Sequence, residues 1–589
     1  MLERNDKLIV MKFREYLLPT MIVTIAMAAA MVIDSILIGN FLGENALSVI
    51  NLSGPVIFCM NTMVILFVAG GVIQTAIAKG RREDEKASKV FTLTIFGGLC
   101  GILLFSILLR VFIGPLTNVL TQGNGELASM VTEYLSPFVY VAPVIFLYNI
   151  SFFVRSDGYP KVFARIALTA CIVKPVFGYI FIRYMDFGLA SAALSSAVGY
   201  GCGVIVMLPY FFSKQRTLRF LKPNKPDFLF INPILLCGLP KALNQILSIA
   251  RTIILNMLIL STIGVEGATA MAVCTMAFVM TLTFITGTND TLIPIVGTLF
   301  GERDFKGVRY AMGSGLKVLS FTTLLFMTAF LLFPTQVGLI FGVQSTDGSE
   351  ALATALRLNA LSLPLFCINF TFQSFFQSTG REKAASVIAV LNSFVFIVLF
   401  AFLITRIDGN LIWISFLFSE AATLIFILLY GRAVRKKENV KGAFLLSDDG
   451  EQELWEVSIP ATEAAAVGVS EAAINFCLEN SIDKKSATLL GVAIEEMIMS
   501  TIVYAHPKKE GRLDICLRCT NELLIVRFRD DGIPFDPTAC KSDTDESETA
   551  LPVATESIEV LNRISKEIMY SWQLGFNSTI ITISRSSLV

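Results

Sequence analysis

The sequence is poor in charged residues. Asp, Glu, Lys and Arg together make up 16% of its 589 residues, whereas soluble globular chains carry roughly 25%. The deficit lies almost wholly before residue 431, where many apolar runs reach the ~20 residues that a helix needs to cross a bilayer. The composition therefore excludes a wholly soluble protein, and it predicts a membrane body followed by a soluble tail.

An excess of charge of either sign is also missing. The chain has 47 Lys and Arg against 47 Asp and Glu, so a nucleic-acid partner is not expected. The 11 cysteines include no CxxC pair, and His506 is the one histidine. We therefore predict no metal site and no disulfide framework. His506 ends a predicted helix of the tail, where a cation is favoured by the helix dipole, so a structural role is expected for it.

Twelve apolar spans are predicted before residue 432. They lie near residues 17–39, 48–78, 90–112, 131–153, 163–183, 187–212, 233–262, 268–299, 311–333, 352–378, 384–405 and 411–431. Lys and Arg gather in alternate loops, such as 79–89 and 214–225, while loops of the other side carry almost none. The positive-inside rule then places both termini in the cytoplasm of a cell whose inner or plasma membrane holds the body.

The body repeats itself at an offset of about 221 residues. The run LGENALS at 42–48 resembles IGVEGATA at 263–270, and KGRRE at 79–83 resembles FGERD at 300–304. Each half then holds six spans, and the repeats are parallel. We expect a first lobe at 1–225, a second lobe at 226–432, a linker at 433–452 and a tail domain at 453–589. Substrate sites in repeat-built transporters lie near the midplane between the halves.

The body resembles the MATE family (multidrug and toxic compound extrusion) of secondary transporters. The matching runs are LPTM at 18–21, VIDSILIG at 32–39, NLSGP at 51–55 and GLASAAL at 188–194, and the resemblance covers roughly residues 10–432. It implies two six-helix lobes and export of a small molecule or drug against an inward flow of Na⁺ or H⁺. It also implies an antiporter, not an enzyme.

Ionisable side chains inside spans are costly and mark candidate sites. Asp34 lies in the first span, where the resemblance implies a cation site. Lys174, followed by Pro175, lies near the middle of the fifth span, at a position where relatives with a Na⁺ site commonly have Asn. Ser196 offers a hydroxyl in the sixth span. We hypothesise that an Asp34–Lys174 ion pair replaces a Na⁺ site; alternatively, Asp34 lies in water and Lys174 snorkels to a vestibule.

The second half offers fewer ionisable candidates. Arg251, Asn369 and Gln373 are added to the candidate cation and substrate site. Helix–helix contact is the alternative role for the amides. Acidic residues in the spans are few, which weakens the usual expectation of a cavity that attracts organic cations.

The tail has the pattern of a small α/β domain with two layers. Strands are predicted at 454–459, 512–519, 522–529 and 579–584, and helices at 462–479, 486–505 and 558–568. The tail resembles the GHKL ATPase fold in the form of the anti-sigma-factor serine kinases. The resemblance is carried by AIEEMIMSTIVYA at 493–505, DDGIPFDP at 530–537 and LGFN at 574–577.

The resemblance implies roles that the residues only partly support. Glu496 stands at the position of the general base, and Asp530 at that of the residue that reads adenine, with Gly532 and Asn577 beside it. Ser500 replaces the Asn that would bind Mg²⁺, and the expected Gly-rich lid at 548–554 has no glycine. ATP and Mg²⁺ binding are therefore expected to be impaired, and the tail is expected to be a degenerate regulatory module; serine kinase or ATPase activity is the alternative.

Two other functions remain open. The body could be a membrane sensor that signals through the tail to an anti-sigma-type protein partner, or it could be a flippase for a lipid-linked substrate. The expected partners are membrane lipid and a small-molecule substrate, and the coupling ion of the transporter would be H⁺ or Na⁺.

Overall fold

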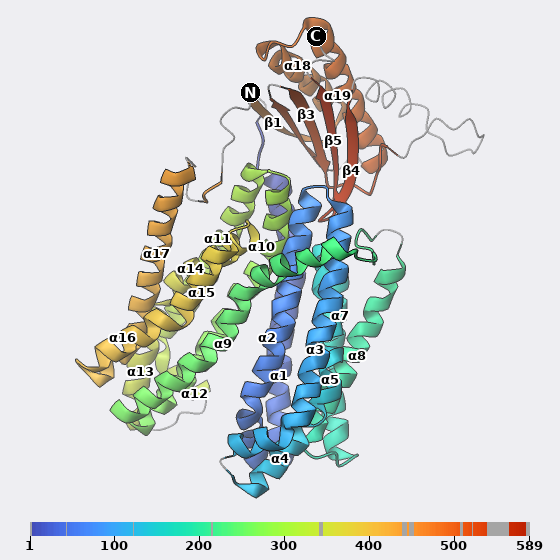
Figure 1. Cartoon of the computed structure of the whole chain (residues 1–589). Coiled ribbons are helices and arrows are strands. Elements are labelled where there is room, and N and C mark those ends of the chain that lie inside the picture. Colours follow the sequence, from blue (N-terminus) through green and yellow to red (C-terminus); the bar gives the residue numbers. More distant parts are fainter. Residues whose placement is uncertain are drawn as a thin grey trace. The chain divides into compact units, whose positions relative to one another are not determined.

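Figure 1 shows a computed structural model of the chain. It describes residues 3–42, 44–121, 123–213, 216–340, 346–438, 444–446, 453–506, 511–520, 522–538 and 565–584. The chain divides into two compact units, a body of Phe13–Asn439 and a tail unit of Met1–Lys12 with Val440–Val589. Helix α1 (Lys7–Leu42) begins in the tail unit and continues into the body.

The described secondary-structure elements of the body are all helices. Its first half holds α1, α2 (Glu44–Gly80), α3 (Asp84–Leu120), α4 (Gly125–Leu135), α5 (Phe138–Asn149), α6 (Ser151–Ser156), α7 (Pro160–Arg183) and α8 (Ala190–Phe212). Its second half holds η1 (Lys225–Phe230), α9 (Ile231–Thr262), α10 (Val265–Gly301), α11 (Phe305–Leu332), α12 (Pro334–Ile340), α13 (Thr346–Ala360), α14 (Leu363–Ser378), α15 (Glu382–Val390), η2 (Leu391–Val395), α16 (Phe396–Thr405), η3 (Gly409–Trp413) and α17 (Ile414–Glu438).

The predicted membrane body is confirmed. Twelve helices of the described chain are long and apolar enough to cross a membrane, and eleven of them belong to the body. The twelfth is α19 (Lys484–Ala505) of the tail unit, whose apolar face packs in the core of the tail. The body gains its own twelfth span from a pair of segments, Leu352–Ala360 and Leu363–Ser378, which meet at a bend of 44°.

The two halves repeat each other in structure. Helix α2 begins at Glu44 and α10 at Val265, and they end at Gly80 and Gly301, so both ends are offset by 221 residues (265 − 44 and 301 − 80). The offset holds for backbone detail, since Arg82 has φ of 63° and Arg303 has φ of 56°. Positive φ is uncommon for residues other than glycine. The repeat inferred from two loops therefore extends through whole helices and the turns that follow them.

Each half has its own apolar core. The first is built around residues such as Phe91, Phe146 and Phe153, and the second around residues such as Leu255, Leu356 and Trp413. In Figure 1 the blue-to-teal helices of the first half lie beside the green-to-orange helices of the second. Smaller apolar clusters join the two halves, such as the one that Ile73 of α2 forms with Cys237 of α9.

The described part of the tail unit is a five-stranded antiparallel sheet with two helices. The strands are β1 (Glu453–Pro460), β2 (Arg512–Cys519), β3 (Leu523–Asp530), β4 (Glu567–Gln573) and β5 (Phe576–Ser584), in the spatial order β1-β2-β3-β5-β4. Helices α18 (Glu463–Glu479) and α19 cover the face that presents residues such as Val457, Ile515 and Val526. The predicted two-layer α/β domain is confirmed.

One predicted element of the tail is wrong at its end. A helix was expected at 558–568. Residues 558–564 lie outside the described chain, and Glu567 and Ile568 belong to strand β4. A hairpin turn at Leu574 and Gly575 forces this, because both residues have positive φ (54° and 76°) and fold β4 back onto β5. The lid expected at 548–554 also lies outside the described residues.

The opposite face of the sheet holds the start of the chain. Glu456 and Asp514 alternate with core residues along β1 and β2 and so point away from the helices. Arg4 Nη1 lies 2.9 Å from Glu456 Oε1, and Arg4 Nε lies 3.3 Å from Asp514 Oδ2, with all three side chains almost fully buried. Lys12 Nζ donates to the carbonyl oxygen of Gly575 at 3.1 Å. We call residues 4–12 the N-terminal arm.

Candidate functional site

The structure pairs Asp34 of α1 with Lys174 of α7. The ammonium nitrogen Nζ lies 2.5 Å from Asp34 Oδ2, and about one fifth of each side chain is exposed. Room for the lysine comes from Gly199 of α8, where a Cβ would lie 2.7 Å from Lys174 Cβ. The ring of Tyr200 lies 6.0 Å from Nζ. The expected ion pair is present, while its role as a replacement for a cation site stays a prediction.

Ser196 does not join this pair through any described contact. Its hydroxyl donates to the carbonyl oxygen of Ala192 at 2.9 Å, within its own helix α8. Back-bonding of this kind is a common way for a serine inside a helix to satisfy its hydroxyl. The sequence correctly placed Ser196 in the neighbouring span, but spacing alone could not show that the hydroxyl bonds to the backbone.

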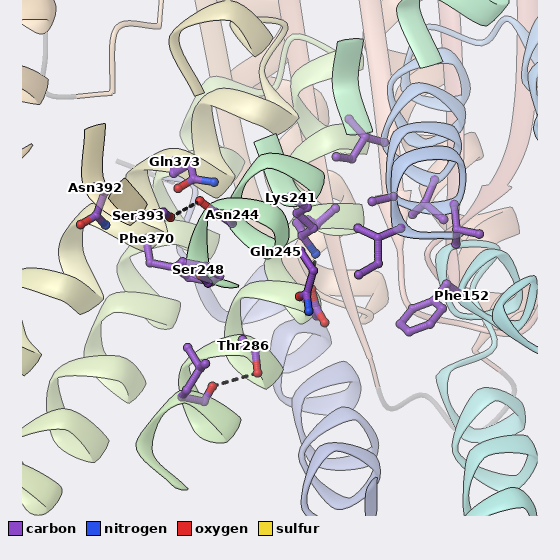
Figure 2. A pocket seen from close by; sticks show the side chains of 18 of the residues that line it. Phe152, Lys241, Asn244, Gln245, Ser248, Thr286, Phe370, Gln373, Asn392 and Ser393 are labelled. Carbon is purple, nitrogen blue, oxygen red and sulfur yellow. Dashed lines mark hydrogen bonds and ion pairs between the residues drawn. The ribbon is translucent and has the colours of Figure 1, made fainter. Parts of the chain in front are cut away.

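A cavity of about 450 Å³ lies between the two halves of the body. The first half contributes residues of α1, α2, α5 and α6, and the second contributes residues of α9, α10, α14 and η2. In Figure 2 Phe152 and Phe370 lie on opposite sides of the cavity, with Lys241 and Gln245 between them. The volume falls within the roughly 300–1,000 Å³ typical of small-molecule sites.

Two of the predicted residues line this cavity. Arg251 of α9 and Gln373 of α14 are part of its wall, whereas Asp34, Lys174 and Ser196 are not. Among polar contacts in the wall, Ser393 Oγ donates to Asn244 Oδ1 at 2.7 Å (Figure 2). The predicted site therefore separates into two places, an ion pair inside the first half and a cavity between the halves.

The sequence reasoning missed a second ion pair in the cavity wall. Lys241 Nζ of α9 lies 2.7 Å from Asp290 Oδ1 of α10, and each side chain is about one quarter exposed. Lys241 follows Pro240 inside an apolar run, just as Lys174 stands next to Pro175 in the fifth span. A lysine beside a proline in a span was thus an available signal for both pairs.

Glu420 of α17 was also missed, although it is a lone carboxylate in an apolar span. Asn369 Nδ2 donates to its Oε2 at 2.7 Å and to its backbone oxygen at 2.9 Å. Asn392, which lines the cavity, donates to Oε1 at 2.8 Å when its amide nitrogen faces the carboxylate. Asn369 therefore has a structural partner, and together with Asn392 it holds a buried carboxylate behind the cavity wall.

In the tail, three of the predicted nucleotide-site residues meet in one cluster. Asp530 Oδ1 accepts hydrogen bonds from Gly532 N at 2.9 Å and from Asn577 Nδ2 at 2.8 Å. His506 Nε2 lies 3.2 Å from the same oxygen, and His506 is the C-terminal cap of α19. The cluster joins the ends of β3, β5 and α19, so these side chains already stabilise the domain without a nucleotide.

Glu496 and Ser500 lie one turn apart on α19, and residues at this spacing share a face of the helix. Ser500 is 4% exposed, and its Oγ forms no hydrogen bond to any described residue. This buried hydroxyl could therefore donate or accept a hydrogen bond, but it forms none with the described residues of the Asp530 cluster. The nucleotide roles of Glu496 and Ser500 stay predictions, as do those of Asp530, Gly532 and Asn577.

Comparison with known proteins supports the interpretation of the body. A family model described as MatE matches residues 19–180 and 240–403. The chain is 26% identical over 419 residues to the multidrug export protein MepA of Staphylococcus saprophyticus, covering 68% of this chain and 90% of that protein. It is 24% identical to MepA of Staphylococcus aureus, covering 72% of this chain and 95% of that protein.

Solved structures share the fold of the body. One is the outward-facing conformation of a multidrug resistance MATE family transporter of the MOP superfamily, with a TM-score of 0.65, 21% identity, and coverage of 73% of this chain and 97% of that one. Another is a MOP superfamily transporter from Pyrococcus furiosus, with a TM-score of 0.66, 19% identity, and coverage of 74% and 97%. For the Pyrococcus protein, a binding pocket of reverse polarity suggests a different function.

Proposed function

The chain belongs to the MatE family, and from this premise we propose that its body is an antiporter that exports a small molecule or drug across the cell membrane. The observation that carries the proposal is the cavity of about 450 Å³ lined by both halves of the repeat. In repeat-built transporters such a site is exposed to alternate sides when the halves move against each other. The two MepA relatives, described as multidrug export proteins, support the substrate class.

We place the coupling ion at the Asp34–Lys174 pair. Protonation of Asp34 would remove the negative charge that holds the ammonium 2.5 Å away. Entry of Na⁺ would compete with the same ammonium for the carboxylate. Either event frees Lys174 and alters the contact between α1 and α7. An inward ion gradient would then drive export by repeatedly opening this pair.

The experiment is transport by purified protein in proteoliposomes under an imposed pH or Na⁺ gradient. We expect gradient-driven accumulation of fluorescent small molecules, tested with matched probes of positive and negative charge. Asp34→Asn should reduce the rate at least tenfold, and Lys174→Asn should change its dependence on Na⁺. The exposed Glu126→Gln is the matched control and should transport normally. Transport that ignores both gradients, or that is unchanged in both pair variants, would refute the proposal.

We further propose that the tail is a regulatory module on the cytoplasmic side, which the charge of the loops assigns to both termini. The N-terminal arm supports this, because residues 4–12 contact the sheet of the tail through Arg4 and Lys12 and include the first turns of α1. The same helix carries Asp34. A change in the tail that releases the arm would therefore act on the helix that bears the coupling carboxylate.

We propose that the tail binds a nucleotide weakly and does not transfer its phosphoryl group. Asp530 Oδ1 already accepts bonds from Gly532 and Asn577, and Ser500 offers only a hydroxyl where Mg²⁺ would be held. Equilibrium dialysis of the whole protein with labelled ATP tests this. We expect weak binding that does not depend on Mg²⁺ and that is lost in Asp530→Ala. Tight, Mg²⁺-dependent binding with turnover would contradict it and would restore Glu496 as a general base.

A further inference from the structure

The ionisable residues that line the cavity are unequal in sign. Arg155, Lys241 and Arg251 are basic, and Asp290 is the one acidic residue in the described wall. Lys241 and Asp290 neutralise each other at 2.7 Å. Two guanidinium groups are left, and a charge held inside a protein is costly unless an opposite charge or hydrogen bonds compensate it.

One of these two guanidinium groups, that of Arg251, is influenced by the acidic residue Glu420. Glu420 is the charged residue that acts electrostatically on Arg251, although Asn369 and Asn392 hold its carboxylate by hydrogen bonds. Arg251 has no hydrogen bond or ion pair with a described residue. The acidic group that acts on it therefore belongs to its own half of the body.

Arg155 has no acidic residue of its own among the described residues. The residue is 3% exposed, and its Nε is buried without a hydrogen bond to any described residue. Its guanidinium carbon lies 5.1 Å from the ring of Phe152 and 5.0 Å from the ring of Phe163. Cation–π contacts stabilise a guanidinium but leave its charge in place. The acidic group that acts on it is Asp290, which is already paired with Lys241.

The rest of the wall suits an apolar body. Phe152, Phe278, Phe366 and Phe370 line it, and Gln245 and Gln373 add neutral hydrogen-bonding groups. Aromatic side chains supply large contact areas, and an arginine offers parallel N–H donors that match a carboxylate or sulfonate. An aromatic compound with one negative charge fits both the aromatic wall and the arginine.

We propose that the cavity selects amphipathic organic anions, with Arg155 as the group that binds the acidic end and the phenylalanines as the surface that holds the apolar end. This inference rests on the proposed function, in which the cavity is the transport site. It differs from the expectation of a cationic substrate, because three basic residues line the described wall against one acidic residue, Asp290.

The test uses dansyl probes that share one fluorophore and differ in charge: anionic dansylglycine, neutral dansyl amide and cationic dansylcadaverine. Binding to the purified full-length protein is followed by fluorescence anisotropy. We expect dansylglycine to bind on the order of 10–100-fold more tightly than dansylcadaverine, as one charge-assisted contact allows. Arg155→Gln should remove this preference, while the exposed Arg406→Gln should keep it.

A second variant guards against misfolding of Arg155→Gln. Asp290→Asn leaves Lys241 without its partner, so it should raise the affinity for dansylglycine and lower that for dansylcadaverine. Equal or tighter binding of the cation by the wild type, or an anion preference that survives Arg155→Gln in folded protein, would overturn the proposal.

Transport of the same probes separates this inference from the proposed function. If the anion binds through Arg155 but is not moved under an ion gradient, the inference stands and the antiporter function fails. If only the cation is bound and moved, the function stands and the inference fails.

Discussion

Gly80 and Gly301 lie 221 residues apart in the chain and touch each other in the structure. A Cβ on Gly80 would lie 2.8 Å from Cα of Gly301, and a Cβ on Gly301 would lie 2.8 Å from Cα of Gly80. They are the last residues of α2 and α10, the helices that correspond in the two halves. The contact is therefore reciprocal, as a two-fold relation between repeats requires, and it joins the halves where their backbones approach closely.

The first prediction concerns this glycine contact. Gly80→Ala or Gly301→Ala should lower the free energy of unfolding by roughly 1–3 kcal/mol, because an added methyl group has to displace backbone. Thermal unfolding in detergent measures this. Gly201→Ala is the control, since nothing lies within 4 Å of its Cβ, and it should be neutral or slightly stabilising. Single variants as stable as the wild type would refute the close contact.

The two substitutions should also be coupled. After the first methyl group has separated the helices, the second should cost less, so the double variant should be more stable than the sum of the two effects predicts. Strict additivity would mean that the two positions do not share one contact.

A second prediction follows from the Asp34–Lys174 pair. Removing either partner leaves the other charge unpaired and should cost about 1.5–3 kcal/mol of stability, the range for a hydrogen bond to a charged group. The double variant Asp34→Asn/Lys174→Asn removes both charges, so its stability should return toward that of the wild type. Thermal unfolding of all four proteins completes the cycle. A double variant that loses the sum of both single effects would show that the residues act independently.

The same double variant separates stability from coupling. We expect it to fold well but to lose gradient-driven transport, because no carboxylate is left to bind the ion. Full transport by this variant would place the coupling ion elsewhere, and Glu420 would then be the next carboxylate to replace.

A third prediction concerns Asp157, which is 0% exposed at the end of α6. Its carboxylate accepts hydrogen bonds from Lys79 of α2, from Tyr210 Oη of α8 at 2.6 Å and from Thr217 N at 3.1 Å. Asp157→Ala would leave the Lys79 ammonium buried without its partner, so it should lower stability by about 3–5 kcal/mol. The exposed Glu126→Ala should stay within about 0.5 kcal/mol. A small effect of Asp157→Ala in thermal unfolding would contradict a closed network.

The sequence predicted the body well because its signals are local. A span is recognised from about 20 consecutive apolar residues, and the repeat is recognised from short runs of similar sequence. The structure follows both signals through α2 and α10. The Asp34–Lys174 pair could be proposed because the resemblance supplied the proximity of the first and fifth spans. Lys241–Asp290 and Asn369–Glu420 had no such guide. Their members lie 49 and 51 residues apart, and only the packing of the helices brings them together.

The tail shows a different limit. Alternation predicted its sheet, but it could not show that Glu456 and Asp514 would bind an arginine from the far end of the chain. The structure holds Arg4 between these two carboxylates. A charge near a terminus gives no sequence signal of its partner, because the partner is 452 residues away.

The last prediction tests this arm. Arg4→Ala leaves Glu456 and Asp514 close together without their shared cation, and it should destabilise the tail by about 3–5 kcal/mol. Cys477 reports on the tail, because burial, with the nearby Cys519 thiol, raises its pKa to about 12 and so keeps it a protonated, unreactive thiol at about pH 8. Site-resolved labelling with a thiol reagent should therefore be faster at Cys477 in Arg4→Ala. The exposed Lys7→Ala should label like the wild type, and equal rates in both variants would show that the arm does not support the tail.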